Sequence, residues 1–82
     1  MADLTLADLK PGQFVRIESI DSDEVTVQRL MVLGLVEGAV LQFLRASLGG
    51  DPLEFQVFGA AISLRRDQAR RFHVIELADD GL

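Results

Sequence analysis

One stretch of ten residues, Arg29–Gly38, constrains the fold more than any other part of the chain; its sequence is RLMVLGLVEG. Gly34 follows an apolar run with helical spacing, and glycine adopts the left-handed conformation after a helix end without a Cβ clash. Leu30 and Leu35 then take the two positions whose apolar contact accompanies a Schellman ending. Glu37–Gly38 is typical of a turn. The stretch therefore predicts that a helix ends and that a strand begins shortly afterwards.

The helix that Gly34 ends is expected to span about residues 24–33. The segment Asp21–Asp23 precedes it and offers side chains that accept hydrogen bonds from the first free amides. At under three turns, this helix needs packing against a core to be stable. One face is apolar and should lie against that core; it holds Val27, Leu30 and Met31, with Leu33 at its flank. Val25 and Val32 lie to the side, where partial exposure is expected.

Alternation of apolar and polar residues predicts strands elsewhere in the chain. They cover residues 13–20, 40–46, 53–58, 61–64 and 72–77. The alternation breaks at Ser19–Ile20, which indicates a bulge or bend, and Gly59–Ala60 indicates a tight hairpin turn. Short helical turns are expected at Thr5–Lys10 and at Arg66–Arg70. Five short antiparallel strands with one inserted helix favour a small closed or nearly closed β-barrel, because closure removes exposed strand edges.

The chain has 82 residues, of which 49% are apolar, and it has no cysteine. This length supports one hydrophobic core, so we expect a single domain over residues 1–77 and an acidic tail over residues 78–82. The lack of cysteine excludes disulfides and thiolate chemistry and favours a reducing compartment such as the cytoplasm. The longest apolar run, Leu30–Val36, is far shorter than the about 20 residues that span a bilayer. No membrane insertion is expected.

The net charge of −5 opposes nucleic-acid binding, which depends on the neutralisation of phosphates. The charges are distributed unevenly along the chain. Acidic residues gather near Asp21, whereas arginines gather late, at Arg65, Arg66, Arg70 and Arg71. Solvated surface charge explains this pattern, and a basic patch for an acidic protein surface is the alternative.

Few side chains are suited to catalysis or metal binding. His73 is the only histidine, and a single imidazole without cysteine makes no recognisable metal site, so we expect it on the outer face of the last strand. Asp21, Asp23 and Glu24 lack the ligand order of a calcium loop, and helix capping accounts for them better. Gly49–Gly50 is more typical of a flexible loop than of a phosphate site, and a serine nucleophile would lack a base. We predict no enzyme, no cofactor and no metal site.

Four segments together resemble the FeoA family, ferrous iron transport protein A. Arg29–Gly38 is similar to the family pattern RLxxLGLxxG, and the resemblance extends over residues 4–77. The other segments lie at matching positions: Leu9–Gly12 (LKPG), Gly50–Leu53 (GDPL) and Gly59–Ala69 (GAAISLRRDQA). Two departures are visible, since Ser47 stands where the family often has proline and the acidic tail is not part of the pattern.

The resemblance implies an SH3-like barrel, in agreement with the predicted strands. It also implies a cytosolic accessory protein of bacterial ferrous iron uptake, one that binds the cytoplasmic part of the membrane permease FeoB and promotes or regulates its activity. The same barrel forms the C-terminal domain of metal-dependent repressors of the diphtheria toxin repressor type. A regulatory domain in metal-responsive transcription is therefore the alternative, because fold alone does not settle function. The sequence leaves the oligomeric state open.

We expect two segments to contact the partner, each combining turn-forming and apolar residues. They are Leu33, Gly34, Leu35 and Val36 at the helix end, and Gly50, Asp51 and Pro52 in the later loop. Val32, Val36 and Phe58 are expected outside the core, where they would add to a docking surface. A partner helix in a groove and a strand added to an open barrel edge both fit. An arginine supplied to a GTPase by Arg29, Arg65 or Arg66 is a further alternative.

Overall fold

Five strands form one antiparallel sheet whose spatial order is β4-β3-β2-β1-β5. The computed structural model describes residues 4–21 and 24–77. The helix α1 follows β1, the short helix α2 joins β4 to β5, and the 3₁₀ turn η1 lies between β2 and β3. The bounds are β1 (Phe14–Ile20), α1 (Val25–Val32), β2 (Val40–Ala46), η1 (Leu48–Gly50), β3 (Leu53–Val57), β4 (Ala60–Leu64), α2 (Arg66–Ala69) and β5 (Phe72–Glu76).

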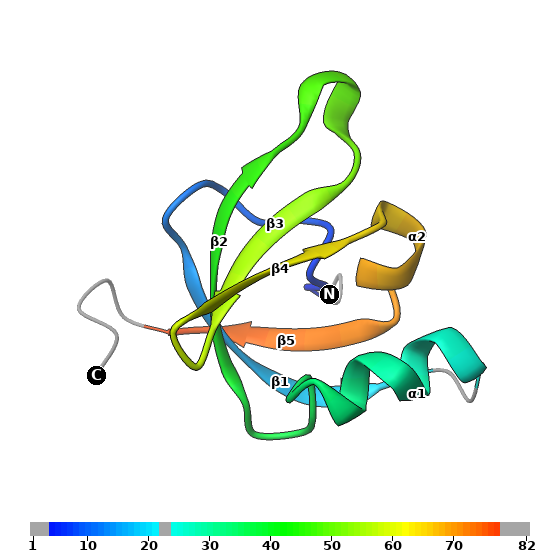
Figure 1. The fold of residues 1–82 in the computed structure, drawn as a ribbon. Helices are drawn as coiled ribbons and strands as arrows, with labels where there is room; N and C mark the ends of the chain where they lie inside the picture. Colours follow the sequence, from blue (N-terminus) through cyan, green and yellow to red (C-terminus); the bar gives the residue numbers. More distant parts are fainter. Residues whose placement is uncertain (1–3, 22–23, 78–82) are drawn as a thin grey trace.

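The sheet curls around one hydrophobic core, and α1 runs along one end of the curled sheet (Figure 1). The buried side chains come from all strands, both helices and the connections: Leu6, Val15, Ile17, Val27, Leu35, Ala39, Leu41, Phe43, Leu53, Phe55, Val57, Leu64, Ala69, Phe72 and Val74. The ring centroids of Phe43 and Phe55, two members of this core, lie 5.4 Å apart. Burial of each large apolar side chain contributes about 1.5–3 kcal/mol. The predicted arrangement of five antiparallel strands with one inserted helix is confirmed.

The end of α1 follows the prediction for Gly34. The Leu35 N–H donates to the Leu30 carbonyl at 3.2 Å, and the Gly34 N–H donates to the Met31 carbonyl at 3.0 Å. These two bonds define a Schellman ending with Leu33 as the C-cap and Gly34 at a φ of 111°. Leu35 is fully buried and Leu30 packs against the same core. The chain therefore leaves the helix with one leucine pointing inward, as the sequence indicated.

The start and the inner face of α1 differ from the prediction. Glu24 takes the N-cap position; two of the expected capping residues, 22 and 23, lie outside the described residues. The Asp21 N–H donates to the Arg71 carbonyl, which ties this segment to the start of β5 instead. Met31 is 36% exposed, so the prediction that it faces the core is wrong. Leu33, which was expected at the flank of that face, is 61% exposed. The helix lies at the rim of the sheet and touches the core through a narrower stripe than its sequence indicates.

The strand connections also correct two details. The hairpin turn between β3 and β4 is Phe58–Gly59, because Val57 pairs with Ala60, and not Gly59–Ala60 as predicted. Residues 5–8 form a single hydrogen-bonded turn, in which the Asp8 N–H donates to the Thr5 carbonyl, and not a helical turn. The irregularity expected near Ser19 is confirmed, since the register between β1 and β5 shifts between Ile17 and Ser19.

Candidate functional site: an apolar patch beside the helix end

Four apolar side chains near the end of α1 are exposed. They form what we call the helix-end patch: Val32 (86% exposed), Leu33 (61%), Val36 (39%) and Phe58 (78%). The first three belong to the end of α1 and the segment after it, and Phe58 belongs to the β3–β4 turn. The predicted exposure of Val32, Val36 and Phe58 is confirmed. Exposed apolar residues that gather in one place are typical of protein interaction surfaces.

The backbone of Gly34 joins the two parts of this patch. A Cβ atom placed on Gly34 would lie 2.9 Å from Cε2 and 3.1 Å from Cδ2 of Phe58, closer than a carbon contact permits. The phenyl ring therefore lies against the glycine backbone, and glycine is required there for two reasons. Its φ of 111° is strained for any residue with a side chain, and the ring occupies the space that a side chain would fill.

Phe58 itself has an unusual backbone conformation. Its φ is 52°. Among the described residues, Phe58 is the only one other than glycine that has a positive φ. Together with the φ of 78° at Gly59, this gives a two-residue hairpin turn of type I′, in which asparagine is the preferred first residue. A phenylalanine there costs on the order of 1 kcal/mol of backbone strain. A mostly exposed aromatic side chain in a strained position is a reason to look for a function.

The four predicted contact residues at the helix end are used in different ways. Leu33 and Val36 are exposed and belong to the patch, whereas Leu35 is fully buried and anchors the segment in the core. Gly34 shapes the backbone and receives the Phe58 ring. The sequence placed Phe58 outside the core and on a possible docking surface, but not among the seven contact residues, because Phe-Gly is not one of the dipeptides that signal a type I′ turn.

The second predicted segment, Gly50–Pro52, is occupied by internal hydrogen bonds. The Gly50 carbonyl accepts from Nε and Nη2 of Arg66 at 3.2 and 2.9 Å. Oδ1 of Asp51 accepts from the Arg66 N–H at 2.9 Å, which caps the start of α2. The Pro52 carbonyl accepts from the Ser47 N–H, and the Asp51–Pro52 peptide bond is cis. The polar groups of this loop therefore stabilise the fold, which reduces what they offer to a partner.

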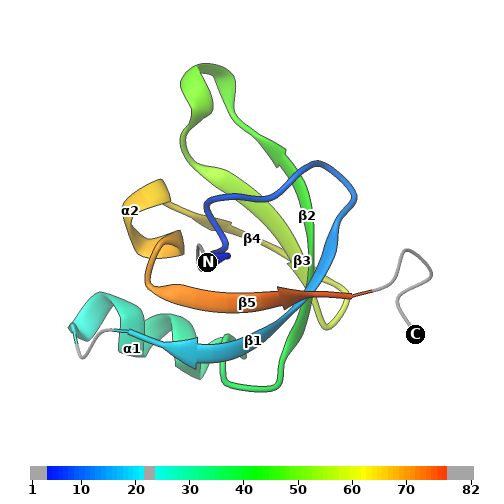
Figure 2. The same cartoon turned by 180° about the vertical axis from the view of Figure 1, so that it is seen from behind.

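The structure does not bring the two predicted segments together. The loop that holds Gly50–Pro52 precedes β3, and the turn that holds Phe58 follows it, so the length of β3 separates them. In Figure 1 the β2–β3 loop stands at the top of the molecule, and the segment after α1 lies at the bottom. The view from behind in Figure 2 shows the same separation. One continuous contact surface cannot consist of these two segments alone.

The four late arginines do not form one basic patch either. Arg66 is directed inward, where its Nη1 donates to the Ala7 carbonyl at 2.9 Å in addition to its bonds to Gly50. Arg71, which follows α2, forms an ion pair with Glu24, which precedes α1; the distance from Nη2 to Oε1 is 3.4 Å. Arg65 and Arg70 are exposed. An exposed ion pair contributes at most about 1 kcal/mol, so this cluster is surface charge with one structural member.

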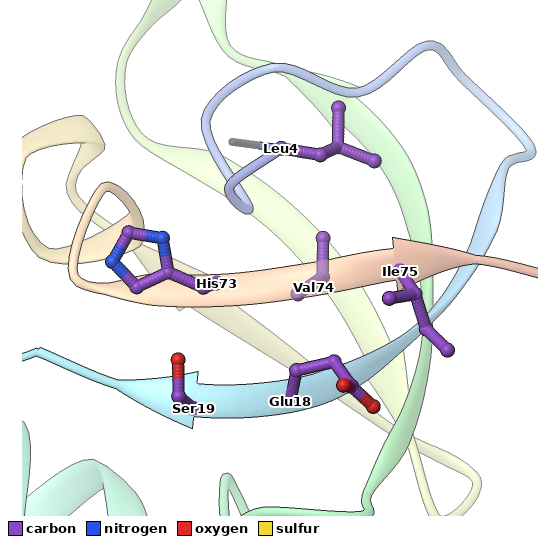
Figure 3. Close-up of a pocket in the computed structure, with 6 residues that line it drawn as sticks. All are labelled: Leu4, Glu18, Ser19, His73, Val74 and Ile75. Carbon is purple, nitrogen blue, oxygen red and sulfur yellow. The ribbon is translucent and has the colours of Figure 1, made fainter. Parts of the chain in front are cut away.

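His73 lies on β5 between two buried residues, and its Nε2 is 3.8 Å from Oδ2 of Asp21. It borders a pocket of about 360 Å³ over β1 and β5 (Figure 3). The side chains in that pocket do not converge, since the imidazole of His73 and the carboxylate of Glu18 lie toward opposite ends. Within residues 4–21 and 24–77, no three histidine or carboxylate side chains gather closely enough to hold a metal ion.

No helix in the described part of the chain combines the length and the apolar character needed to cross a membrane. A small barrel of five antiparallel strands with one inserted helix belongs to the SH3-like class of folds. In a comparison with models of protein families, the model of the FeoA domain matches residues 4–76, which is nearly the whole chain. The chain therefore belongs to the FeoA family, and this membership implies an accessory, non-catalytic role in ferrous iron transport.

Solved structures support the same assignment. The FeoA protein from Chlorobium tepidum is 37% identical, with a TM-score of 0.85, and the match covers 92% of this chain and 71% of that one. FeoA from Stenotrophomonas maltophilia, an SH3 domain protein solved in complex with zinc, is 29% identical, with a TM-score of 0.75 and coverage of 88% and 89%. A manganese-dependent transcriptional repressor shares the fold alone, at 15% identity, a TM-score of 0.81, and coverage of 94% and 42%. A search of curated proteins gave no match.

Proposed function

We propose that this chain is a cytoplasmic accessory protein of ferrous iron uptake that binds the cytoplasmic part of the FeoB permease through the helix-end patch and regulates the permease. The observation that carries the proposal is Phe58. Its ring is 78% exposed and sits on a backbone with a φ of 52°. Phe58 has a strained backbone and exposes a large apolar surface. A contact with a protein partner explains this combination better than a role in folding alone does.

The neighbours of Phe58 support a contact surface of useful size. Leu33 precedes Gly34 and Val36 follows it by two residues, and the Phe58 ring lies against Gly34, so two separate chain segments expose apolar side chains near this glycine. Leu35 fixes the first segment in the core, and the type I′ turn fixes the second. A surface that is rigid before binding loses little conformational entropy when the partner docks. Of the residues predicted for the site, we retain Leu33, Gly34 and Val36 for contact or shape, and Leu35 as support.

The test is a pull-down or titration with the isolated cytoplasmic region of FeoB. Phe58→Asn should weaken binding by tenfold or more, because it removes the aromatic anchor while asparagine followed by glycine suits the turn. Val36→Asp should weaken binding in the same direction. The matched control is Leu48→Asn, since Leu48 is a fully exposed leucine in the loop beyond the other end of β3. Unchanged binding by Phe58→Asn and Val36→Asp would rule out the patch.

Asp51→Ala tests the second predicted segment in the same assay. Because the Asp51 carboxylate caps α2, we expect a loss of stability and unchanged affinity of the folded protein for FeoB. A loss of affinity at full folding would return Gly50–Pro52 to the contact surface. The repressor-like alternative predicts retention of specific DNA in a mobility shift assay with ferrous ion, whereas the proposed function predicts none.

A further inference from the structure

The two outer edges of the sheet are covered differently. The outer edge of β5 bonds to the N-terminal segment, since the Leu6 N–H donates to the Phe72 carbonyl at 3.1 Å and the Val74 N–H donates to the Leu4 carbonyl at 2.9 Å. At the other end of the strand order, β4 has only β3 beside it. In the part of the chain that the structure describes, the fold thus covers one edge with its own backbone and leaves the other open.

The hairpin geometry shows which groups of β4 face outward. Val57 and Ala60 pair across the two-residue Phe58–Gly59 turn, and the residues that flank such a turn form a hydrogen-bonded pair. Bonded and non-bonded pairs alternate along an antiparallel ladder. Ile62 and Leu64 therefore bond to β3 as well, while the N–H and C=O groups of Ala61 and Ser63 point away from it. Between residues 4–21 and 24–77, no backbone hydrogen bond outside the strand ladder involves either residue.

The usual protections of an edge strand are missing from β4. Natural edges carry lysine, proline, inward-pointing charges or bulges that prevent another strand from pairing. The sequence of β4 is AAISL, which has no charge and no proline. Its five pairs with β3 run from Ala60 to Leu64 without a shift in register, unlike the pairs between β1 and β5. The side chains beside the outward groups, those of Ala61 and Ser63, are small and exposed.

We infer that β4 is a pairing edge for a second copy of this chain, in a dimer joined by antiparallel β4 strands with the two-fold axis at Ile62. The outward-facing residues, Ala61 and Ser63, lie symmetrically about Ile62. A second copy in this register sets each Ala61 opposite the other Ser63, and each such pair exchanges two hydrogen bonds. The inward-facing Ile62 is only partly buried in the single chain, and the pairing sets it directly against its own copy.

Charge does not oppose a second copy at this edge. The chain carries a net charge of −5, which acts against self-association in general. No charged residue lies in β4, so the pairing sets no like charges directly opposite each other. In the same register, Arg65 comes beside Gly59 of the second copy, away from the other Arg65. The edge is therefore locally neutral within an acidic molecule.

The strength of this dimer follows from its size. A contact made through one five-residue strand is smaller than the interfaces of stable dimers, which bury roughly 1,200–2,000 Å². We therefore expect dissociation in the high micromolar to millimolar range. This inference does not depend on the proposed binding to FeoB, since β4 contributes no side chain to the helix-end patch.

The test is sedimentation equilibrium of the full chain from micromolar to millimolar concentration, with amide NMR spectra at the same points. The mass should rise from that of one chain toward that of two. The amide signals of Ala61 and Ser63 should move with concentration more than those of Ala60 and Ile62, which bond to β3. A chain that stays monomeric at millimolar concentration, or a dimer in which these two amides do not respond, overturns the inference.

Ala61→Pro removes the outward N–H without removing a bond to β3, and should weaken the dimer by about tenfold or more. The matched control, Ala61→Ser, keeps the N–H and should associate like the unmodified chain. Because proline can disturb β4 itself, Ala61→Lys serves as a second variant; it keeps the backbone groups, adds edge charge, and should also weaken association. A dimer of unchanged strength in either variant sinks the proposal.

Discussion

At one end of β3, around Gly34, apolar side chains are exposed and the backbone is strained; at the other end, in the loop that holds Gly50–Pro52, polar groups are bonded internally. The exposed fractions of Leu33 and Phe58 are 61% and 78%. In contrast, Asp51 and Gly50 accept hydrogen bonds from one residue, Arg66. Both segments contain glycine and turn-forming residues, so local sequence does not distinguish them.

The difference teaches that a glycine-rich turn indicates function only when its side chains are exposed or its polar groups are not bonded within the folded chain. In the β2–β3 loop, the carboxylate, the carbonyls and the arginine that reaches them form bonds within the chain. In the helix-end patch, the glycine lets a phenyl ring approach the backbone, and the ring still faces solvent. The exposed apolar surface that the fold does not bury is therefore at the end of α1.

The largest expected effect separates two leucines within one segment. Leu35→Ala should lower the free energy of unfolding by about 2–5 kcal/mol, because Leu35 is fully buried and the change leaves a cavity. Leu33→Ala should change it by less than about 0.5 kcal/mol, because Leu33 is mostly exposed. Urea unfolding of the two variants measures both values. Equal losses would mean that Leu33 belongs to the core and that the patch is smaller than described.

These two leucines also show how far the sequence specified the fold. The Schellman ending at Gly34 was predicted because it depends on residues within one turn, and its two hydrogen bonds are present. The sequence placed Leu33 only at the flank of the buried face, because the extent of its exposure depends on where α1 lies on the barrel. That position results from contacts among several strands, which a helical pattern does not contain.

The same distinction explains the partial success at the site. The exposure of Phe58 was predicted from alternation along β3, a local pattern. Its turn was misplaced by one residue, because phenylalanine is a rare choice at a positive φ. The bonds between Arg66 and Gly50 join residues 16 apart, and that between Arg66 and Ala7 joins residues 59 apart. No local rule predicts contacts at such separations.

The next largest effect tests the internal use of the β2–β3 loop. Arg66→Ala should destabilise the fold by about 1–3 kcal/mol, since it leaves the partly buried carbonyls of Gly50 and Ala7 without their donor. Arg70→Ala is the matched control and should stay within about 0.5 kcal/mol, because Arg70 is exposed. Thermal unfolding in parallel measures the difference. If both variants unfold alike, the loop is not held by Arg66, and the contrast between the two ends of β3 fails.

A loss of about the same size should follow from Gly34→Ala, about 1–3 kcal/mol, because it combines backbone strain with a clash against Phe58. Gly38→Ala separates these causes. Gly38 has a φ of 90° and nothing within 4 Å of a Cβ atom, so its substitution reports strain alone. The Phe58→Asn change should recover part of the loss in Gly34→Ala and none in Gly38→Ala. Equal recovery in both would show that the ring does not lie against Gly34.

The smallest expected effect on stability is the most informative about function. Phe58→Asn should leave the free energy of unfolding unchanged or raise it by up to about 1 kcal/mol, measured by urea unfolding. Asparagine followed by glycine suits the type I′ turn better than phenylalanine does. The ring buries little of its own surface, so little burial energy is lost.

A clear loss of stability would assign Phe58 to folding, with its ring acting as a cover for Gly34. A gain would mean that phenylalanine at position 58 makes the protein less stable than asparagine does at the same position. Such a residue is explained by what it contacts outside the chain, because contacts inside the chain favour its replacement. The sign of this one small change therefore decides whether the apolar end of β3 differs from the polar end by function or only by packing.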